Sequence, residues 1–132
     1  MEKESAKRKN DYAEFGDLGE ELAAAALEDK GYLILVRKYR RKTGEVDIIA
    51  EDPEKGLLVF VEVKARRSLK FGRPSESVTA AKVRQIKRTA SMYIVECLKP
   101  DKLHRYSGIR FDVIEILVTG SGAEAVHIEG AF

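Results

Sequence analysis

The fold is decided by two apolar runs and the turn between them: Glu45-Val46-Asp47-Ile48-Ile49-Ala50, then Asp52-Pro53-Glu54-Lys55-Gly56, then Leu57-Leu58-Val59-Phe60-Val61-Glu62-Val63-Lys64-Ala65. Both runs are rich in β-branched and aromatic residues, which favour strands, and the turn contains proline and glycine. A connection this short joins antiparallel neighbours. The sequence therefore predicts a β-hairpin over residues 45–65.

The register of this hairpin decides which side chains meet, because side chains alternate between the two faces of a strand. If the turn is centred between Glu54 and Lys55, Asp47 lies opposite Glu62, and Glu45 lies opposite Lys64. Three acids and one lysine then share one face. The alternating residues are predicted to form the opposite, buried face: Val46, Ile48, Val59, Val61 and Val63.

The facing acids indicate a metal site. Two opposed carboxylates repel each other unless a cation lies between them, and Mg²⁺ prefers oxygen ligands. We therefore expect Asp47 and Glu62 to bind Mg²⁺ or Mn²⁺, and Lys64 to position a water molecule or a phosphate. The alternative is an ordinary strand with solvated charges. The apolar run from Leu57 to Val63 argues against it, because it suggests burial on both faces.

Helices and further strands surround the hairpin. Helical periodicity predicts helices over about residues 11–30, which Gly31 ends, and 77–98, with Ser75 or Ser77 as N-cap. Strand-forming residues predict strands over 32–39 and 109–118, and a short one over 123–128. This order predicts an α/β fold with a sheet that has a helix on either face.

Polar residues on both helices are candidates for the site. Glu20 lies at the edge of the predicted buried arc of the first helix, after Gly16 and Gly19, which allow close backbone approach. Lys82 and Gln85 form a row beside the apolar arc of the second helix. The alternative for all these polar residues is a solvated helix surface.

Positive charge flanks the hairpin. The formal net charge is only +2, so the distribution of the cations carries the argument for nucleic acid. They form two clusters: Arg37, Lys38, Arg40, Arg41 and Lys42, then Lys64, Arg66, Arg67, Lys70 and Arg73. We predict nucleic-acid contacts, with DNA favoured, from Arg41, Lys42, Arg66, Arg67, Lys82 and Gln85. Without a recognition helix or zinc finger in the pattern, we expect structure-directed rather than base-specific binding.

Length and composition limit the other options. A chain of 132 residues with 44% hydrophobic and 35% charged residues is large enough for one folded domain. We expect a disordered charged tail over residues 1–11 and a single nuclease-like domain over 12–132. The sequence contains no long apolar segment and only one cysteine, so we expect a cytoplasmic protein without membrane contact. A homodimer is left open.

An ordered set of motifs resembles a known family: Gly16-Asp17-Leu18-Gly19-Glu20, Gly31-Tyr32, Gly44-Glu45-Val46-Asp47-Ile48-Ile49-Ala50, Val59-Phe60-Val61-Glu62-Val63-Lys64-Ala65-Arg66, Phe71-Gly72, Lys82 and Arg110-Phe111-Asp112-Val113. Together they resemble the YraN family of functionally uncharacterised bacterial proteins. That family is similar to the restriction-endonuclease-like PD-(D/E)-x-K superfamily and to archaeal Holliday-junction resolvases.

The resemblance implies a restriction-endonuclease-like α-β-β-β-α-β core with a mixed central sheet. It also implies a catalytic set of Glu20, Asp47, Glu62 and Lys64. The chain departs from relatives that carry Gln-x-x-x-Tyr on the second helix, because Gln85 is followed by Thr89.

Three functions stay open at this point. The favoured one is a metal-dependent endonuclease or phosphodiesterase acting on DNA, with branched or single-stranded intermediates as candidate substrates. The main alternative is a non-catalytic nucleic-acid-binding or adaptor protein that retains the nuclease fold. A protein-interaction module with a merely structural polar patch is the third.

Overall fold

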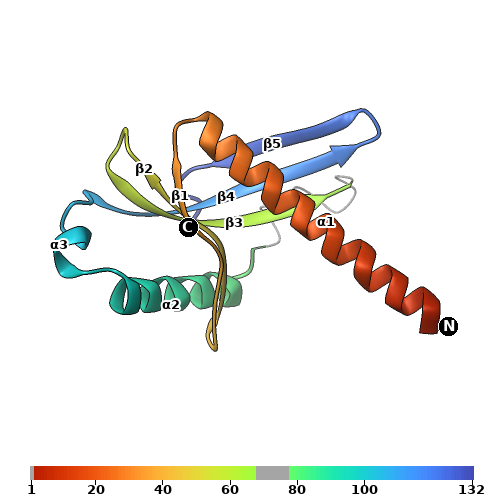
Figure 1. Cartoon of the computed structure of the whole chain (residues 1–132), viewed down its shortest axis with the longest axis horizontal. Coiled ribbons are helices and arrows are strands. Elements are labelled where there is room, and N and C mark those ends of the chain that lie inside the picture. Colours follow the sequence, from red (N-terminus) through yellow and green to blue (C-terminus); the bar gives the residue numbers. More distant parts are fainter. Residues whose placement is uncertain (1, 68–77) are drawn as a thin grey trace.

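A computed structural model describes residues 2–67 and 78–132, and the backbone alone for residues 2–14. Its elements are α1 (Glu2–Asp29), β1 (Leu33–Arg41), β2 (Gly44–Asp52), β3 (Leu57–Arg66), α2 (Ala80–Cys97), α3 (Pro100–Leu103), β4 (Gly108–Thr119) and β5 (Gly122–Ile128). Within these residues the strands form one sheet in the order β1-β2-β3-β4-β5 (Figure 1). β3 and β4 run parallel and the other neighbours run antiparallel. The predicted α/β fold with a mixed sheet, consistent with a restriction-endonuclease-like core, is confirmed.

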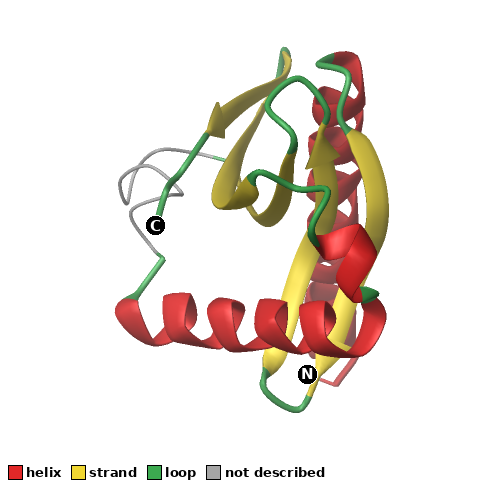
Figure 2. Ribbon diagram, turned by 90° about the vertical axis from the view of Figure 1, so that its left-hand side faces the viewer, coloured by secondary structure: helices red, strands yellow, loops and turns green. Residues whose placement is uncertain are grey.

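Helices α1 and α2 cover opposite faces of the sheet (Figure 2). Ala23, Ala24 and Leu27 of α1 pack on one face against a cluster that includes Ile48 and Val61. Side chains of α2 form the second cluster, on the other face: Ile86, Ala90 and Tyr93 contact Val46, Ile49, Leu58 and Phe60. The central strands therefore supply apolar side chains to both faces, as the continuous apolar run of β3 indicates.

The hairpin register agrees with the sequence prediction. β2 and β3 pair from Ile48 opposite Val61 to Asp52 opposite Leu57. Gly56 closes the turn with a φ of 66°, a conformation that glycine adopts without steric cost. The turn residues therefore fix the register that the site depends on.

Helix α1 differs from the prediction in its start and in its buried face. The charged composition predicts disorder for residues 1–11, whereas the structure has helix from Glu2, because lysine, glutamate, alanine and arginine are good helix formers. The helical spacing of Leu18, Leu22 and Ala25 predicts a buried stripe through Leu18, but Leu18 is 46% exposed. The helix instead turns its small residues to the sheet, since a Cβ on Gly19 would lie 2.8 Å from the Cβ of Ala65.

The N-cap of α2 is Thr79, whose Oγ1 accepts a hydrogen bond from the Lys82 N–H at 3.2 Å. Ser75 and Ser77, the predicted caps, lie outside the described residues, as do Lys70 and Arg73 of the second basic cluster. Threonine has the same capping oxygen as serine, so the first turn is stabilised in the expected way. Among the described helices, none has the length and apolarity needed to cross a membrane.

Candidate metal centre

Asp47 lies where the regular alternation of β2 breaks. The β1–β2 ladder pairs Arg37 with Ile48 and Tyr39 with Val46, and it skips Lys38 and Asp47 between them. Lys38 has a φ of 55°, an uncommon left-handed conformation for a residue with a side chain.

The break moves Val46 to the other face of the sheet. The prediction that Val46 and Ile48 share a buried face is wrong, because Val46 packs with Ile49 on the α2 side while Ile48 packs on the α1 side. Regular alternation cannot place Val46 and Ile49, three residues apart, on one face. The irregularity therefore sets Asp47 apart from both clusters.

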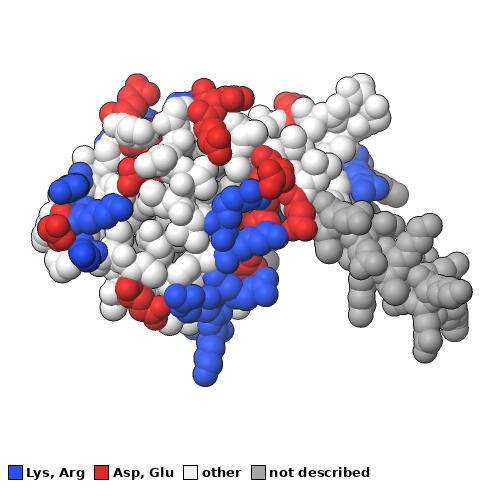
Figure 3. All heavy atoms as spheres, viewed as in Figure 1, with Lys and Arg blue, Asp and Glu red and all other residues white. Residues whose placement is uncertain are grey.

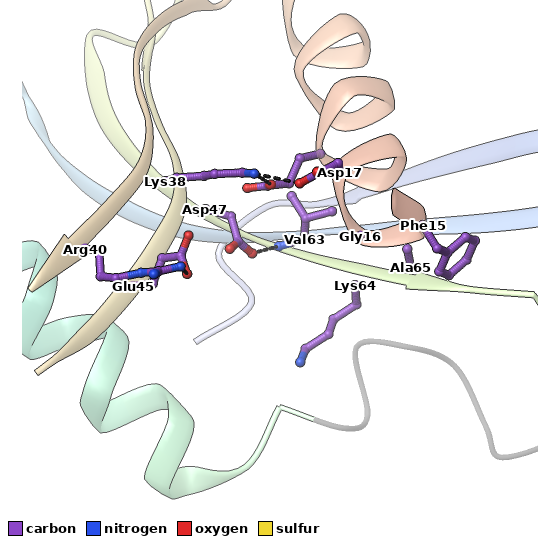
Figure 4. A pocket seen from close by; sticks show the side chains of 11 residues that line it. Phe15, Gly16, Asp17, Lys38, Arg40, Glu45, Asp47, Val63, Lys64 and Ala65 are labelled. Carbon is purple, nitrogen blue, oxygen red and sulfur yellow. Dashed lines mark hydrogen bonds and ion pairs between the residues drawn. The ribbon is translucent and has the colours of Figure 1, made fainter. Parts of the chain in front are cut away.

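The Asp47 carboxylate replaces a rung of the β2–β3 ladder. Cα pairing ends at Ile48 and Val61, and beyond it Asp47 Oδ2 accepts a hydrogen bond from the Val63 N–H at 2.7 Å (Figure 4). The predicted pairing of Asp47 with Glu62 is thus not a rung of the ladder. The two strands separate there, and the carboxylate fills the gap between them.

Glu62 and Lys64 lie on the α2 side of β3, the side to which Phe60 also points. Glu62 is buried, and its Oε1 lies 3.6 Å from the Lys64 Nζ and 3.9 Å from the Lys82 Nζ of α2. Two cations therefore approach one buried carboxylate. Lys82, predicted as a nucleic-acid contact, is brought to the site.

Glu20 reaches the site from the α1 side. Its residue surface is 8% exposed, because the close approach of Gly19 to Ala65 holds this turn of α1 against β3. Glu20 Oε2 lies 3.4 Å from the Lys38 Nζ, and Glu20 Oε1 is buried without a hydrogen-bond partner. The sequence predicts Glu20 at the edge of the buried arc, and the structure places it fully within that arc.

Burial raises the pKa of all three of the predicted acids. Burial and the nearby charge of Glu62 raise the pKa of Asp47 to about 7. Burial also raises the pKa of Glu62 against the opposing effect of Lys82 and Lys64, and burial followed by the charge of Asp47 raises that of Glu20. Carboxyls with raised pKa values in one place are typical of functional sites, and a divalent cation would stabilise their charged forms.

A pocket of about 460 Å³ opens beside Glu20 and Asp47 (Figure 4). Its lining comes from α1, β1, β2 and β3: Phe15, Gly16, Asp17, Glu20, Lys38, Arg40, Glu45, Asp47, Val63, Lys64 and Ala65. Oxygen atoms of Glu20, Glu45 and Asp47 all lie within 4.8 Å of one another. The space and the oxygen donors both suit a hydrated hard cation.

Sequence reasoning assigned no role to Glu45 and counted Lys38 only as part of a basic cluster. The alternation of the strand places Glu45 near Asp47, which is a usable signal. The position of Lys38 depends on its positive φ, and a lysine residue gives no sequence signal for that conformation.

Two further predicted nucleic-acid residues, Arg41 and Gln85, make contacts between the β1–β2 hairpin and α2. Arg41 forms an ion pair with Glu96 of α2 at 3.0 Å and covers the ring of Tyr39. The Gln85 side chain lies against Gly44, at the β1–β2 turn. Arg41 and Gln85 therefore connect the β1–β2 hairpin to α2.

The remaining cations lie at two ends of the site. Lys42 is exposed at the β1–β2 turn, while Arg66 and Arg67 end β3 and follow it. The guanidinium of Arg67 lies 4.6 Å from the ring centre of Phe15 on α1. Of the six predicted contacts, the structure brings Lys82 alone next to Glu62 among the described residues.

Comparison with known proteins finds relatives along most of the chain. The model of the "Uncharacterised protein family UPF0102" matches residues 19–116, a range that includes all four predicted catalytic residues. A UPF0102 protein of Trichlorobacter lovleyi is 46% identical over 118 residues, which cover 89% of this chain and 88% of that protein. One from Syntrophomonas wolfei is 41% identical, covering 90% and 97% of the two chains, and one from Caldicellulosiruptor saccharolyticus is 48% identical, covering 78% and 81%.

Proposed function

Because this chain belongs to the uncharacterised protein family UPF0102, the YraN family, whose description names no activity, we propose a function from its site. The protein is a Mg²⁺- or Mn²⁺-dependent phosphodiesterase that cleaves DNA in the cytoplasm. One observation carries the proposal: Asp47 and Glu20 line a pocket together with Lys64, and Glu62 lies next to Lys64. Burial raises the pKa values of all three carboxyls.

The residues present fit a hard divalent cation. Asp47 and Glu62 would hold it, because their oxygens are desolvated and close enough for the charge of Glu62 to affect the pKa of Asp47. The buried, unbonded Oε1 of Glu20 indicates further capacity for a positive ligand. When bound, the metal supplies Lewis-acid stabilisation of phosphate charge and a more acidic water molecule.

The chain's own cations have distinct tasks. Lys64 lines the pocket and also lies next to Glu62, so it can hold a phosphate oxygen at the site. Lys82 belongs to α2, and its Nζ lies 3.9 Å from Glu62 Oε1, so it helps to hold that carboxylate in place. The Val63 N–H holds Asp47 by its Oδ2.

A basic surface next to the pocket supports nucleic acid as the substrate. Figure 3 shows lysine and arginine side chains gathered over the β1–β2 hairpin beside α1, with acidic side chains among them. Such a surface binds the phosphate backbone without reading bases. In Figure 3 it lies beside acidic side chains.

The test is cleavage of linear, single-stranded and four-way DNA in the presence of Mn²⁺. We expect cleavage by the wild type, a loss of more than about 100-fold in Asp47→Asn, and full activity in Asp29→Asn, which removes an exposed acid at the end of α1. Cleavage that Asp47→Asn leaves unchanged would sink the proposal. DNA binding without cleavage by the wild type would favour the adaptor function instead.

A further inference from the structure

The outer face of α2 carries positive charge that the fold leaves uncompensated. Within residues 80–88 the helix has four cations and no acid, and Glu96, in the last turn, is its only acid. One of the cations, Lys82, lies 3.9 Å from Glu62 of β3. The other three are exposed, and their spacing of i, i+3 and i+4 puts them on one stripe of the helix. These are the outer cations: Arg84, Lys87 and Arg88.

We propose that the outer cations bind the phosphate backbone of double-stranded DNA, beyond the phosphate that the pocket holds. The inference rests on the proposed function in taking DNA as the ligand. It adds a contact surface on the side of α2 that faces away from the sheet, because Ile86, Ala90 and Tyr93 occupy the side that packs on β2 and β3.

The order of charges along α2 is unfavourable for the helix itself. Acids in the first turn and cations in the last turn stabilise a helix, whereas α2 has no acid in its first turn and no cation in its last. Arg84 and Arg88 are also four residues apart, a spacing at which like charges repel. A bound polyanion would offset both costs, so the arrangement suits a charged partner better than it suits the free helix.

Acidic side chains do not neutralise the outer cations. Among the side chains that the structure describes, Arg84 and Arg88 have no ion-pair or hydrogen-bond partner, and Lys87 Nζ lies 5.6 Å from the ring centre of Phe111. The outer cations can therefore contact phosphates without breaking an ion pair. The arginines of β1, by contrast, are paired at 2.7–3.2 Å: Arg37 with Glu21, Arg40 with Glu45, and Arg41 with Glu96.

The aromatic residues nearby favour a duplex over a single strand as the ligand. Proteins that bind single strands stack the bases on aromatic side chains. The sole aromatic residue of α2, Tyr93, is 7% exposed and packs on the sheet. Phe111, beside Lys87, is stacked between Phe60 and Phe132, so neither face of its ring is free. A surface that offers cations alone suits a duplex, whose phosphates lie outside and whose bases are stacked within.

The helix links the outer cations to the candidate centre. Lys82 contacts Glu62, and Arg88 follows Lys82 by six residues, which is about 9 Å along the axis of an α-helix. One strand of a duplex carries a phosphate about every 3.4 Å along the axis, so this length corresponds to about three phosphates. A duplex with one phosphate at the pocket therefore extends past the outer cations.

Salt-dependent DNA binding tests the inference without metal or cleavage. Fluorescence anisotropy with a short labelled duplex in EDTA gives the slope of log affinity against log salt, to which each phosphate contact contributes about 0.9. The triple variant Arg84→Gln/Lys87→Gln/Arg88→Gln should lower that slope by about 2–3. It should also weaken binding more than about tenfold at about 0.1 M salt.

A matched control removes the same charge from another exposed surface. Lys99, Lys102 and Arg105 are exposed beyond the C-terminal end of α2. The variant Lys99→Gln/Lys102→Gln/Arg105→Gln should lower the slope by less than about 1. A loss as large as that in the outer-cation variant would show that net charge, and not the α2 surface, determines binding, and would overturn the inference.

Urea unfolding separates a binding role of the outer cations from a structural one. Because their neutralisation removes repulsion along α2, the triple variant should unfold at the same urea concentration as the wild type or at a higher one. A lower midpoint would show that the outer cations stabilise the fold, and it would count against the inference.

The remaining outcomes distinguish this inference from the proposed function. An unchanged slope in the triple variant, with cleavage by the wild type in Mn²⁺, would overturn the inference and leave the proposed function intact. Binding that depends on the outer cations, without cleavage by the wild type, would support the inference and contradict the proposed function. Tighter binding of a single strand than of the duplex, or no binding of either, would overturn the inference.

Discussion

The Asp47 carboxylate accepts a 2.7 Å hydrogen bond from the Val63 backbone N–H, at the point where the backbone ladder between β2 and β3 has ended. The side chain therefore has two tasks. It joins two strands in place of a backbone carbonyl, and under the proposed function it also offers charge to a cation. The two tasks can be separated by substitution.

Asp47→Asn and Asp47→Ala should differ in stability but not in metal binding. Asparagine keeps a carbonyl oxygen for the Val63 N–H, whereas alanine leaves that donor without its partner, which costs about 1–3 kcal/mol. We expect both variants to lose Mn²⁺ binding and the alanine variant alone to unfold at lower urea. Equal urea midpoints for the two variants would contradict the bridging role.

Without metal, the protein should become less stable as pH rises from about 4 to 7. The pKa of Asp47 is about 7 in the folded chain, against a usual value of 3.8, so the folded state binds more protons in this interval. The resulting stability is complete below the lower pKa and is lost as pH rises through the upper one.

The difference between wild type and Asp47→Asn reports this contribution together with the change it causes in Glu20 and Glu62, whose pKa values respond to Asp47. We expect urea unfolding to show a free-energy difference that changes by about 1–4 kcal/mol between pH 4 and 8. Saturating Mn²⁺ should remove the loss at high pH. A difference that does not vary with pH would refute the assignment.

Gly19→Ala should move α1 away from the sheet. Its new Cβ would lie 2.8 Å from the Cβ of Ala65, a distance that the two backbones can relieve only by separating. We expect a loss of about 1–3 kcal/mol in unfolding free energy, together with weaker Mn²⁺ binding through Glu20.

The double variant Gly19→Ala/Ala65→Gly should recover part of that loss, because it removes the opposing methyl group. Gly16→Ala is the control, since nothing lies within 4 Å of its new Cβ, and alanine favours a helix. Destabilisation by Gly16→Ala as large as that by Gly19→Ala would show that contact with Ala65 is not the cause.

Asp112→Asn should destabilise the fold without affecting metal binding. Asp112 is fully buried and bonds to Arg110, the His127 ring and the Gly130 N–H. Removing its charge leaves Arg110 with Asp52 as its nearest carboxylate, at 3.1 Å, and weakens three buried hydrogen bonds, so we expect a loss of about 1–3 kcal/mol. Urea unfolding measures the loss, and Glu124→Gln, at an exposed position of β5, should show none.

The hairpin illustrates what the sequence could and could not predict. The Pro- and Gly-containing turn was sufficient for the register of Ile48 opposite Val61, because turn geometry and strand pairing are local. The face of Val46 was not predictable, since it depends on the left-handed conformation of Lys38, on the neighbouring strand.

Helix α1 shows a second limit. Periodicity favoured a stripe through Leu18, but the sheet requires a close approach that only small side chains allow, and Gly19 provides it. That approach depends on Ala65, which is distant in sequence. The burial of Glu20 follows from this tertiary contact and not from any helical pattern.

DNA affinity should depend on Lys42 more than on Arg41, although the two residues are adjacent. Lys42 is exposed and makes no ion pair within the part of the chain that the structure describes, whereas Arg41 is held by Glu96 at 3.0 Å. Each phosphate contact contributes about 0.9 to the slope of log affinity against log salt. We expect Lys42→Ala to lower that slope by about this amount and Arg41→Ala by less.

Glu96→Gln should raise DNA affinity, because it releases Arg41 from its ion pair. Fluorescence anisotropy at several salt concentrations measures all three, and equal slopes for the two basic variants would count against the paired state of Arg41 on DNA.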